Sequence, residues 1–427
     1  MTHHRVLNTL TLLAALALLA ASAVAQESDQ QAENPHQLTL DDLRTFTDVF
    51  NQARRNYVEP VDEKALLDSA IRGMLTDLDP HSAYLAPEQF SELEDASHGR
   101  YSGVGVSLET GSQKIVVDAV INDSPADMAG IDPGDIITAI DGVPVKGRFL
   151  PDAINDMDGD PGSDISLTVI KPDGEEKELS LTREYILIPT LSFEMLDDDY
   201  GYFKMTQFHR DSATDLENAL ESIAADDITL HGLVLDLRDN PGGVLQPAVA
   251  IADGFLDQGL IVTTRGRNAS MQMEFNAQAG DWLPGIPVVL LVDRGSASAS
   301  EVLAGALQDH GRALVVGERT FGKGSVQSVL PLRNGGGIKL TTARYYTPSG
   351  KSIQAQGIMP DIEIDLHSQD EPGMEIQRES DLEGHLANEG EPIETSQTDA
   401  EGSLQFPVEE ILSVLENADL LGGSPGG

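Results

Sequence analysis

The chain has 427 residues, with 27 basic and 71 acidic side chains, a net charge of −44, and no cysteine. The charge excludes nucleic acid as the main partner, because phosphate binding needs clustered cations, and it disfavours an anionic membrane surface. The lack of cysteine excludes a disulfide scaffold, a thiolate metal site and a cysteine nucleophile. The length allows two or three domains with a full hydrophobic core.

The first 25 residues are typical of a secretory signal. Residues 3–5 form a weakly basic start, residues 10–19 are an apolar run, and residues 23–25 are small residues suited to cleavage. The alternative is an uncleaved anchor helix, which would leave the protein membrane-associated, although the run is short for a full span. Because an exported chain without cysteine points to a bacterial envelope, we expect a periplasmic protein with a disordered lead-in at residues 26–38.

An N-terminal helical segment is expected over residues 39–96. Apolar side chains at helical spacing predict one helix over residues 41–57 and another over residues 63–78. The second helix ends at Asp79-Pro80-His81-Ser82. A histidine next to a proline turn is more often a turn or packing residue than a catalytic one, so we interpret His81 in that way.

A compact β-rich module is expected over residues 97–182. Residues 124–143 read as a short helix, a turn and a strand. This pattern resembles a PDZ domain of the kind found in bacterial proteases. The resemblance implies that an extended peptide adds to a sheet edge and that its terminal carboxylate meets backbone N–H groups of one turn. That glycine-bearing turn consists of Tyr101, Ser102, Gly103, Val104, Gly105 and Val106.

From residue 183 to 366 the pattern changes to a mixed α/β core, which makes the whole chain an α/β (α+β) multidomain protein. The strand predicted at residues 232–237 enters a tight turn, Arg238 to Gly243, and α/β sheets carry their sites at such strand ends. Further strands are predicted at residues 200–208, 288–292, 313–317 and 338–346, and helices at residues 212–224 and 301–311.

Five small residues, 296–300, stand between the strand at residues 288–292 and the helix that Glu301 opens. A hydroxyl at a strand-to-helix corner is exposed beside free N–H groups of the helix start, and these could stabilise an oxyanion. Downstream, Lys323 lies between two glycines. We therefore predict a serine nucleophile with a lysine base. From the residues alone, any of the three serines in the corner could be the nucleophile.

Combined, the motifs resemble the carboxy-terminal processing peptidases, also called tail-specific proteases. The resemblance covers roughly residues 40–366 in the family's order. It implies an exported serine endopeptidase with a Ser-Lys dyad, a supporting glutamine, and a PDZ domain that gates the entry of substrate C termini. The motifs are residues 79–85, 237–243, 296–301, Lys323 with Gln327, and 345–350.

Carried over onto matching positions, the resemblance makes Ser298 the nucleophile, Lys323 the base and Gln327 its support. A lysine base must be neutral, yet its ordinary pKa of about 10.4 leaves little free amine at neutral pH. The site must therefore bury Lys323 or place it near positive dipoles. Residues 321–324 carry no carboxylate that would keep the ammonium charged, and Gln327 can orient the amine without raising its pKa.

An oxyanion hole needs N–H groups aimed at the developing negative charge. We expect one from Ala299, at the start of the helix after the serine corner, and one from the turn at Gly242 and Gly243. Glycine lets the backbone approach the substrate closely, and Gly243 is the favoured one of the two.

No metal or nucleotide cofactor is expected, because three related motifs fail their requirements. Residues 317–324 are close to a phosphate-binding loop but lack the Ser or Thr that would bind magnesium. Residues 347–352 lack the upstream glycine, and residues 156–160 resemble a calcium loop in which Pro161 replaces the required glycine. The zinc-protease motif His-Glu-x-x-His is absent from the sequence.

The leading hypothesis is a periplasmic serine endopeptidase that cleaves unfolded or tail-exposed polypeptides near their C termini. The alternatives are a non-catalytic PDZ scaffold with a decayed protease domain and an ATP-using protein built on residues 317–324. The resemblance also implies an assembly, a dimer or larger, and leaves open an adaptor lipoprotein that delivers substrates. Residues 367–427 form an acidic tail. Residues 367–405 of this tail are predicted to be disordered or loosely attached, and residues 408–421 are predicted to form one terminal helix.

Overall fold

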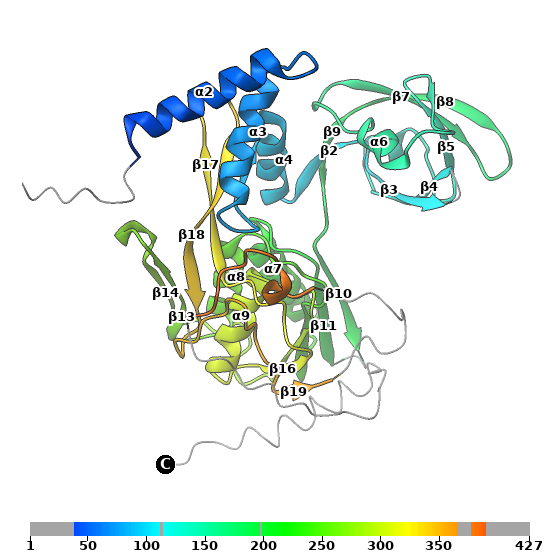
Figure 1. The fold of residues 1–427 in the computed structure, drawn as a ribbon. Helices are drawn as coiled ribbons and strands as arrows, with labels where there is room; N and C mark the ends of the chain where they lie inside the picture. The colour runs from blue at the N-terminus through cyan, green and yellow to red at the C-terminus, as the bar shows by residue number, and fades with distance from the viewer. Residues whose placement is uncertain (1–37, 112–113, 197–198, 365–376, 390–427) are drawn as a thin grey trace, which may run out of the picture. The chain divides into compact units, whose positions relative to one another are not determined.

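The computed structural model describes residues 38–111, 114–196, 199–364 and 377–389. The predicted signal and nearly all of the lead-in, and the predicted terminal helix, lie outside these residues. The fold is mixed α/β with N-terminal helices and several sheets, as predicted (Figure 1). Within the described ranges, no helix has the length and apolar character needed to cross a bilayer. The described residues divide into two compact units, with the boundary between Ile71 and Arg72.

The first unit contains α2 (Leu40–Asn56) and the start of α3 (Glu63–Thr76), which confirms both predicted helices. A capping box begins α2, because Thr39 Oγ1 accepts the N–H of Asp42 and the Asp42 carboxylate accepts the N–H of Thr39. Arg54 and Glu63 form an ion pair of 3.1 Å. One face of α2 exposes at least half of each apolar side chain: Leu40, Leu43, Phe46 and Val49.

A six-stranded antiparallel sheet forms the β-rich module. Its strand order is β3-β4-β5-β7-β8 with β6 on β5, so β3 is an edge strand of this sheet. Ile115, Ile137 and Leu167 are at most 1% exposed and lie in its separate hydrophobic core. The elements are β3 (Val106–Gly111), β4 (Lys114–Val120), α5 (Pro125–Met128), β5 (Ile136–Ile140), β6 (Val143–Pro144), α6 (Leu150–Asn155), β7 (Asp164–Ile170) and β8 (Glu176–Thr182).

A two-stranded pair marks both ends of this module. Strand β2 (Arg100–Gly103) pairs antiparallel with β9 (Glu184–Leu187). The stretch from Tyr101 to Val106 is therefore not one turn, as predicted, but the end of β2, a link at Val104 and Gly105, and the start of β3. Sequence pattern missed this because the partner strand lies about 80 residues away and a short strand gives little local signal.

The mixed α/β core predicted from residue 183 to 366 is built on a six-stranded sheet in the order β10-β11-β12-β15-β16-β19. Only the β10–β11 pair is antiparallel within this sheet. Central strands β12 and β15 are buried at every position, as expected for parallel strands covered on both faces. The strands are β10 (Leu191–Leu196), β11 (Tyr200–Met205), β12 (Gly232–Asp236), β15 (Val288–Val292), β16 (Leu314–Gly317) and β19 (Ile362–Glu363).

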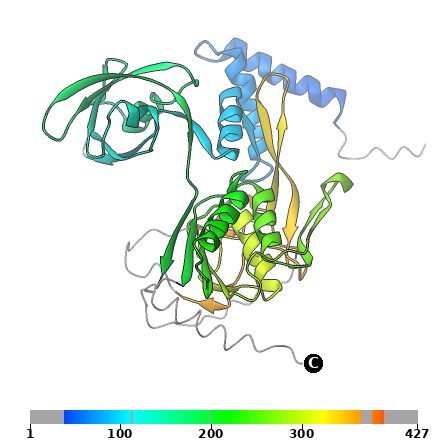
Figure 2. The ribbon, with the colours of Figure 1, turned by 180° about the vertical axis from the view of Figure 1, so that it is seen from behind.

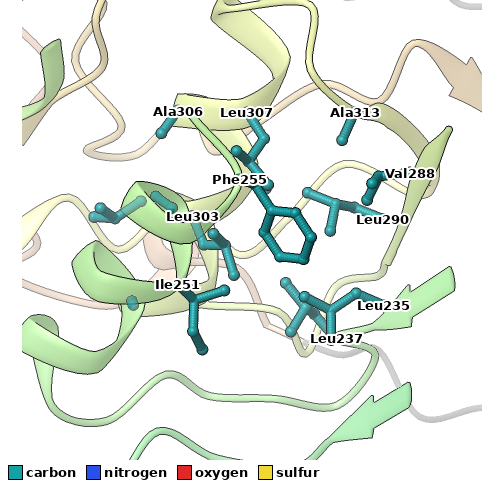
Figure 3. Close-up of a cluster of buried hydrophobic side chains, with 14 of the residues drawn as sticks. Leu235, Leu237, Ile251, Phe255, Val288, Leu290, Leu303, Ala306, Leu307 and Ala313 are labelled. Atoms are coloured by element: carbon teal, nitrogen blue, oxygen red, sulfur yellow. The ribbon is translucent and has the colours of Figure 1, made fainter. Parts of the chain in front are cut away.

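Three helices share one hydrophobic cluster with alternate residues of these strands: α7 (Ser212–Ala225), α8 (Leu245–Gly254) and α9 (Ala299–Asp309). The ring of Phe255, just after α8, lies among Leu235, Leu237, Leu290 and Leu303 (Figure 3). This packing holds the start of α9 at the carboxyl end of β15. The predicted helices at residues 212–224 and 301–311 are confirmed.

A second, antiparallel sheet carries the segment that follows Lys323. Strands β17 and β18 form one long hairpin (Figures 1 and 2), and β1 pairs with the start of β18 through Ala83 and Lys339. This pairing brings the Asp79-Pro80-His81-Ser82 motif, just before β1, to β18. The strands are β1 (Ala83–Leu85), β13 (Gly259–Gly266), β14 (Met273–Ala277), β17 (Ser325–Pro331) and β18 (Gly337–Tyr346), and helix α4 (Pro87–Ser97) follows β1.

Residues 377–389 correct a prediction, because they pack on the core instead of being loosely attached. A short 3-10 helix, η2 (Glu379–Asp381), leaves Glu379 only 1% exposed, and the Glu379 N–H donates to Phe321 O at 3.2 Å. Arg344 Nη1 donates to Ala387 O at 2.7 Å. The segment has few apolar residues and is held largely by hydrogen bonds, so a composition argument could not detect its docking.

Candidate active site

Ser298 stands where the chain turns from β15 into α9. Its backbone has φ 56° and ψ −111°, in a region that residues other than glycine rarely adopt. Its N–H donates to Glu301 Oε2 at 2.7 Å. Backbone strain at a non-glycine residue persists only where the surrounding structure enforces it, and such strain is concentrated at functional sites.

The three serines of the corner differ in accessibility. Ser296 Oγ donates to Leu237 O at 2.7 Å and Ser300 Oγ donates to Asn240 O at 2.9 Å, and both residues have no exposed surface. Ser298 is half-buried, and its hydroxyl makes no capping bond to α9. Among the three, Ser298 is therefore the serine whose hydroxyl is accessible to a substrate.

Glu301 is a buried carboxylate that connects two segments: the serine corner, residues 296–300, and the lysine loop, residues 320–324. Oε2 accepts the backbone N–H groups of Ser298 at 2.7 Å and Lys323 at 2.9 Å. Oε1 accepts the Gly322 N–H at 2.7 Å and the Thr320 hydroxyl at 2.5 Å. Complete burial raises the pKa of Glu301 to about 7, while these four hydrogen bonds act in the opposite direction. From the sequence, Glu301 is predicted only to begin a helix.

Lys323 is half-buried in a tightly packed loop. Burial lowers its pKa, and the charge of Lys339 lowers it further, while the carboxylates of Glu379, Glu301 and Asp79 raise it. The adjoining residues carry none, but the fold brings three from distant segments.

Gln327 lies on β17, and the polar atoms of its side chain have unequal surroundings. Nε2 donates to Ser325 Oγ at 3.2 Å and to Thr341 Oγ1 at 2.9 Å. Oε1 is buried, and no residue of the described ranges donates a hydrogen bond to it. A buried acceptor without a donor is costly, so its surroundings call for an explanation.

The glycine turn after β12 packs directly against the serine corner. A Cβ atom added to Gly242 would lie 2.9 Å from Ala299 N and from Ser298 Cβ, so only glycine fits there. The Gly242 N–H already donates to Asn240 Oδ1 at 2.9 Å, which makes it unavailable as an oxyanion donor. Ala299 is the first residue of α9, so its N–H has no acceptor within the helix. Gly243 pairs with Phe208 in an isolated bridge.

Half-buried His81 and buried Glu379 form a pair that the sequence pattern does not predict. His81 Nε2 and Glu379 Oε2 are 2.7 Å apart, and Gln354 Nε2 donates to Glu379 Oε1 at 2.8 Å. Their positions are separated by 298 residues in the chain, so no local pattern could have linked them. The pair joins the docked C-terminal segment to the turn that ends the N-terminal helices.

The predicted peptide-binding residues are held by the β-rich module and by β9. Ser102 Oγ donates to Gly159 O at 2.6 Å, Val104 O accepts the Ala126 N–H at 2.9 Å, and Gly105 O accepts the Ile121 N–H at 2.9 Å. Burial, together with the charge of Asp158, raises the pKa of Tyr101. Gly103 ends β2 and Val106 begins β3. Among the described residues, no cluster of three or more histidine or acidic side chains could hold a metal.

Comparison with known proteins gives consistent matches along the chain. The sequence model of the peptidase family S41 matches residues 199–364, that of the PDZ domain matches residues 116–171, and that of the activating protease CtpB N-terminal domain matches residues 9–89. The chain is 40% identical over 364 residues to the carboxy-terminal-processing protease of Bartonella bacilliformis, covering 84% of this chain and 83% of the relative.

Two further relatives are more distant. A probable CtpA-like serine protease of Staphylococcus aureus is 34% identical over 325 residues, covering 76% of this chain and 65% of that protein. The structure of the photosystem II D1 C-terminal processing protease is 30% identical, with a TM-score of 0.46, and the match covers 77% of this chain and 94% of that chain.

Proposed function

Because this chain belongs to peptidase family S41, the carboxy-terminal processing serine peptidases that carry a PDZ domain, we propose that it is an exported endopeptidase with a Ser298–Lys323 dyad. The observation that carries the proposal is the carboxylate of Glu301. A single oxygen of this group accepts the N–H of Ser298 at 2.7 Å and the N–H of Lys323 at 2.9 Å. The two loops are thereby held together at the accessible serine.

In the proposed reaction, neutral Lys323 takes the proton of the Ser298 hydroxyl while Oγ attacks the carbonyl carbon of the scissile bond. The resulting oxyanion receives hydrogen bonds from the N–H groups of Ala299 and Gly243. The intermediate then collapses, the C–N bond breaks, and Lys323 gives its proton to the leaving amine. A water molecule, deprotonated by Lys323, then attacks the acyl carbon of the acyl-enzyme. The bond from that carbon to Ser298 Oγ breaks, Lys323 returns the proton to Oγ, and the carboxylic acid product leaves. The lowered pKa of Lys323 supports its role as base.

We infer that the β-rich module recognises substrate tails. Strand β3 is an edge strand, so an extended peptide could add to it through backbone hydrogen bonds. The carboxylate of the peptide would meet the N–H groups around Val104 and Gly105, at the link between β2 and β3. This module would thus gate the delivery of polypeptide C termini to Ser298. Unfolded or tail-exposed polypeptides are the proposed substrates.

Location and assembly belong to the same proposal. Residues 1–25 would direct the chain to the periplasm, as a cleaved signal or as an anchor. The exposed apolar face of α2 offers a surface for a second copy of the chain, and an adaptor lipoprotein could deliver substrates.

The test compares the wild-type protein with Ser298→Ala on one unfolded peptide, made with a free and with an amidated apolar C terminus. We expect cleavage by the wild type only, and faster cleavage of the free-acid peptide. Equal rates on both peptides would keep the peptidase and reject tail recognition by the module. If neither protein cleaves while both bind the free-acid peptide, a PDZ scaffold replaces the peptidase.

A further inference from the structure

The docked C-terminal segment, residues 377–389, bonds the backbone of the lysine loop directly. Arg378 Nη1 donates to Thr320 O at 3.0 Å, and the Glu379 N–H donates to Phe321 O at 3.2 Å. The segment lies beyond residue 364, where the match to the sequence model of peptidase family S41 ends. It therefore brings contacts to the lysine loop from outside the matched part of the chain.

The side chain of Glu379 also reaches the far end of the lysine loop, through Gln354. Gln354 has no exposed surface, and its Nε2 donates to Glu379 Oε1 at 2.8 Å and to Leu386 O at 3.1 Å. Its Oε1 accepts the N–H of Gly324, the residue after Lys323, at 3.1 Å. Both amide hydrogens thus go to the docked segment, and the amide oxygen goes to the loop.

The chemistry of these partners leaves the Gln354 amide a single orientation. The carbonyl oxygen of Leu386 only accepts hydrogen bonds, and an ionised carboxylate does the same. Although burial by itself would raise the pKa of Glu379, hydrogen bonds from His81 and Gln354 hold it below its ordinary value, so this carboxyl is ionised. A reversed amide would set two acceptor oxygens face to face and leave the Gly324 N–H without an acceptor.

We propose that the docked segment is a clamp that positions the lysine loop for catalysis, with Arg378 and Glu379 as its positioning residues. The inference rests on the proposed function, in which Lys323 is the base. Two bonds hold carbonyl groups that precede Lys323, and the contact of Glu379 with Gln354 holds the N–H that follows it. Without the segment, buried Gln354 loses both acceptors and no longer fixes Gly324. A base displaced by about 1 Å can cost about 100-fold in rate.

Two substitutions at Glu379 separate the position of the loop from the charge near the lysine. Glu379→Gln removes the charge but keeps an oxygen for Gln354, and its NH₂ group can donate to the ring nitrogen of His81. Glu379→Leu removes both the charge and the acceptor. Glu389→Leu is the matched control, because Glu389 lies in the same segment but accepts the Tyr346 hydroxyl at 2.6 Å and does not bond the loop.

The first measurement is peptide cleavage at a pH above the acidic limb of the pH–rate profile. Glu379→Leu and Arg378→Met should lower kcat by about 10- to 100-fold with KM within about two-fold, because the defect is in the position of the base rather than in substrate binding. Glu379→Gln and Glu389→Leu should keep kcat within about two-fold of the wild type. A wild-type kcat in both Glu379→Leu and Arg378→Met would overturn the inference. An equal loss in Glu379→Gln and Glu379→Leu would also overturn it, since the charge rather than the position would then set the rate.

A second measurement does not depend on activity. Hydrogen exchange of the Gly324 amide is followed by NMR in the Ser298→Ala background, relative to the amides of β12, which report unfolding of the core. Glu379→Leu should make the Gly324 amide exchange about 10-fold faster, because its acceptor is no longer held in place, whereas Glu379→Gln and Glu389→Leu should not. Unchanged exchange in Glu379→Leu refutes the clamp. If the wild type cleaves no peptide, the proposed function fails, and the exchange rates still decide whether the docked segment holds the loop.

Discussion

Glu301→Gln should make the stability of the protein less dependent on pH between about 4.5 and 7. Burial raises the pKa of Glu301 from 4.5 to about 7. The folded protein thus holds this proton more tightly than the unfolded chain does. The contribution of Glu301 to the free energy of unfolding is complete below about pH 4.5 and is lost as the pH rises through about 7. The pKa difference corresponds to a loss of about 3 kcal/mol.

Glu301→Gln should also lower the free energy of unfolding by an amount that does not depend on pH. This loss follows from the four hydrogen bonds that the Glu301 carboxylate accepts. Glutamine can place its NH₂ group at the position of Oε1, where the Thr320 hydroxyl can turn and accept a hydrogen bond. The Gly322 N–H and the Thr320 hydroxyl hydrogen then lose their acceptor, at a cost of about 1–3 kcal/mol each. The remaining oxygen still accepts from Ser298 and Lys323. Glu301→Ala removes all four acceptor bonds, so it should lower both stability and peptidase activity more than Glu301→Gln does.

The assay is urea unfolding from pH 4.5 to 8 in the Ser298→Ala background, which prevents self-cleavage. The single tryptophan, Trp282, packs against Phe255 with ring centroids 5.6 Å apart, so its fluorescence reports the unfolding of the core. Glu318→Gln, which changes a buried carboxylate paired with Arg294, is the control for the loss of a charge. If the free energy of unfolding changes equally with pH in the proteins with and without Glu301→Gln, the reasoning is refuted, because the buried carboxyl would then not titrate in this range.

Three further predictions concern the lysine loop and the surface. Glu379→Gln removes a carboxylate that raises the pKa of Lys323, so the acidic limb of the pH–rate profile should move to lower pH; a limb at the wild-type pH would contradict this. Gly324→Ala places a Cβ atom 2.1 Å from the backbone N of Gln354, so it should lower the Tm and peptidase activity; wild-type values of both would show that the loop can move aside. Because the net charge is −44, added salt should raise the Tm by screening repulsion, and a Tm independent of salt argues against this.

Much of the architecture follows from local pattern. The apolar runs of β12 and β15 predict buried strands, and the 3.6-residue spacing of apolar side chains predicts α7 and α9. The motifs around Ser298 and Lys323 also predict the peptidase family, which the relatives confirm. These features could be predicted because each depends on residues close together in the chain.

The tertiary structure decided what depends on distant residues. The sequence alone does not distinguish Ser296, Ser298 and Ser300. In the structure, Ser296 bonds Leu237 O and Ser300 bonds Asn240 O, which leaves Ser298 as the accessible hydroxyl. The three carboxylates around Lys323 come from Asp79, Glu301 and Glu379, and no sequence spacing relates them. The docking of residues 377–389 depends on hydrogen bonds to separated loops, which leave no periodic signal in composition. Periodicity records which face of an element is buried, whereas the electrostatics of a site depend on which elements meet.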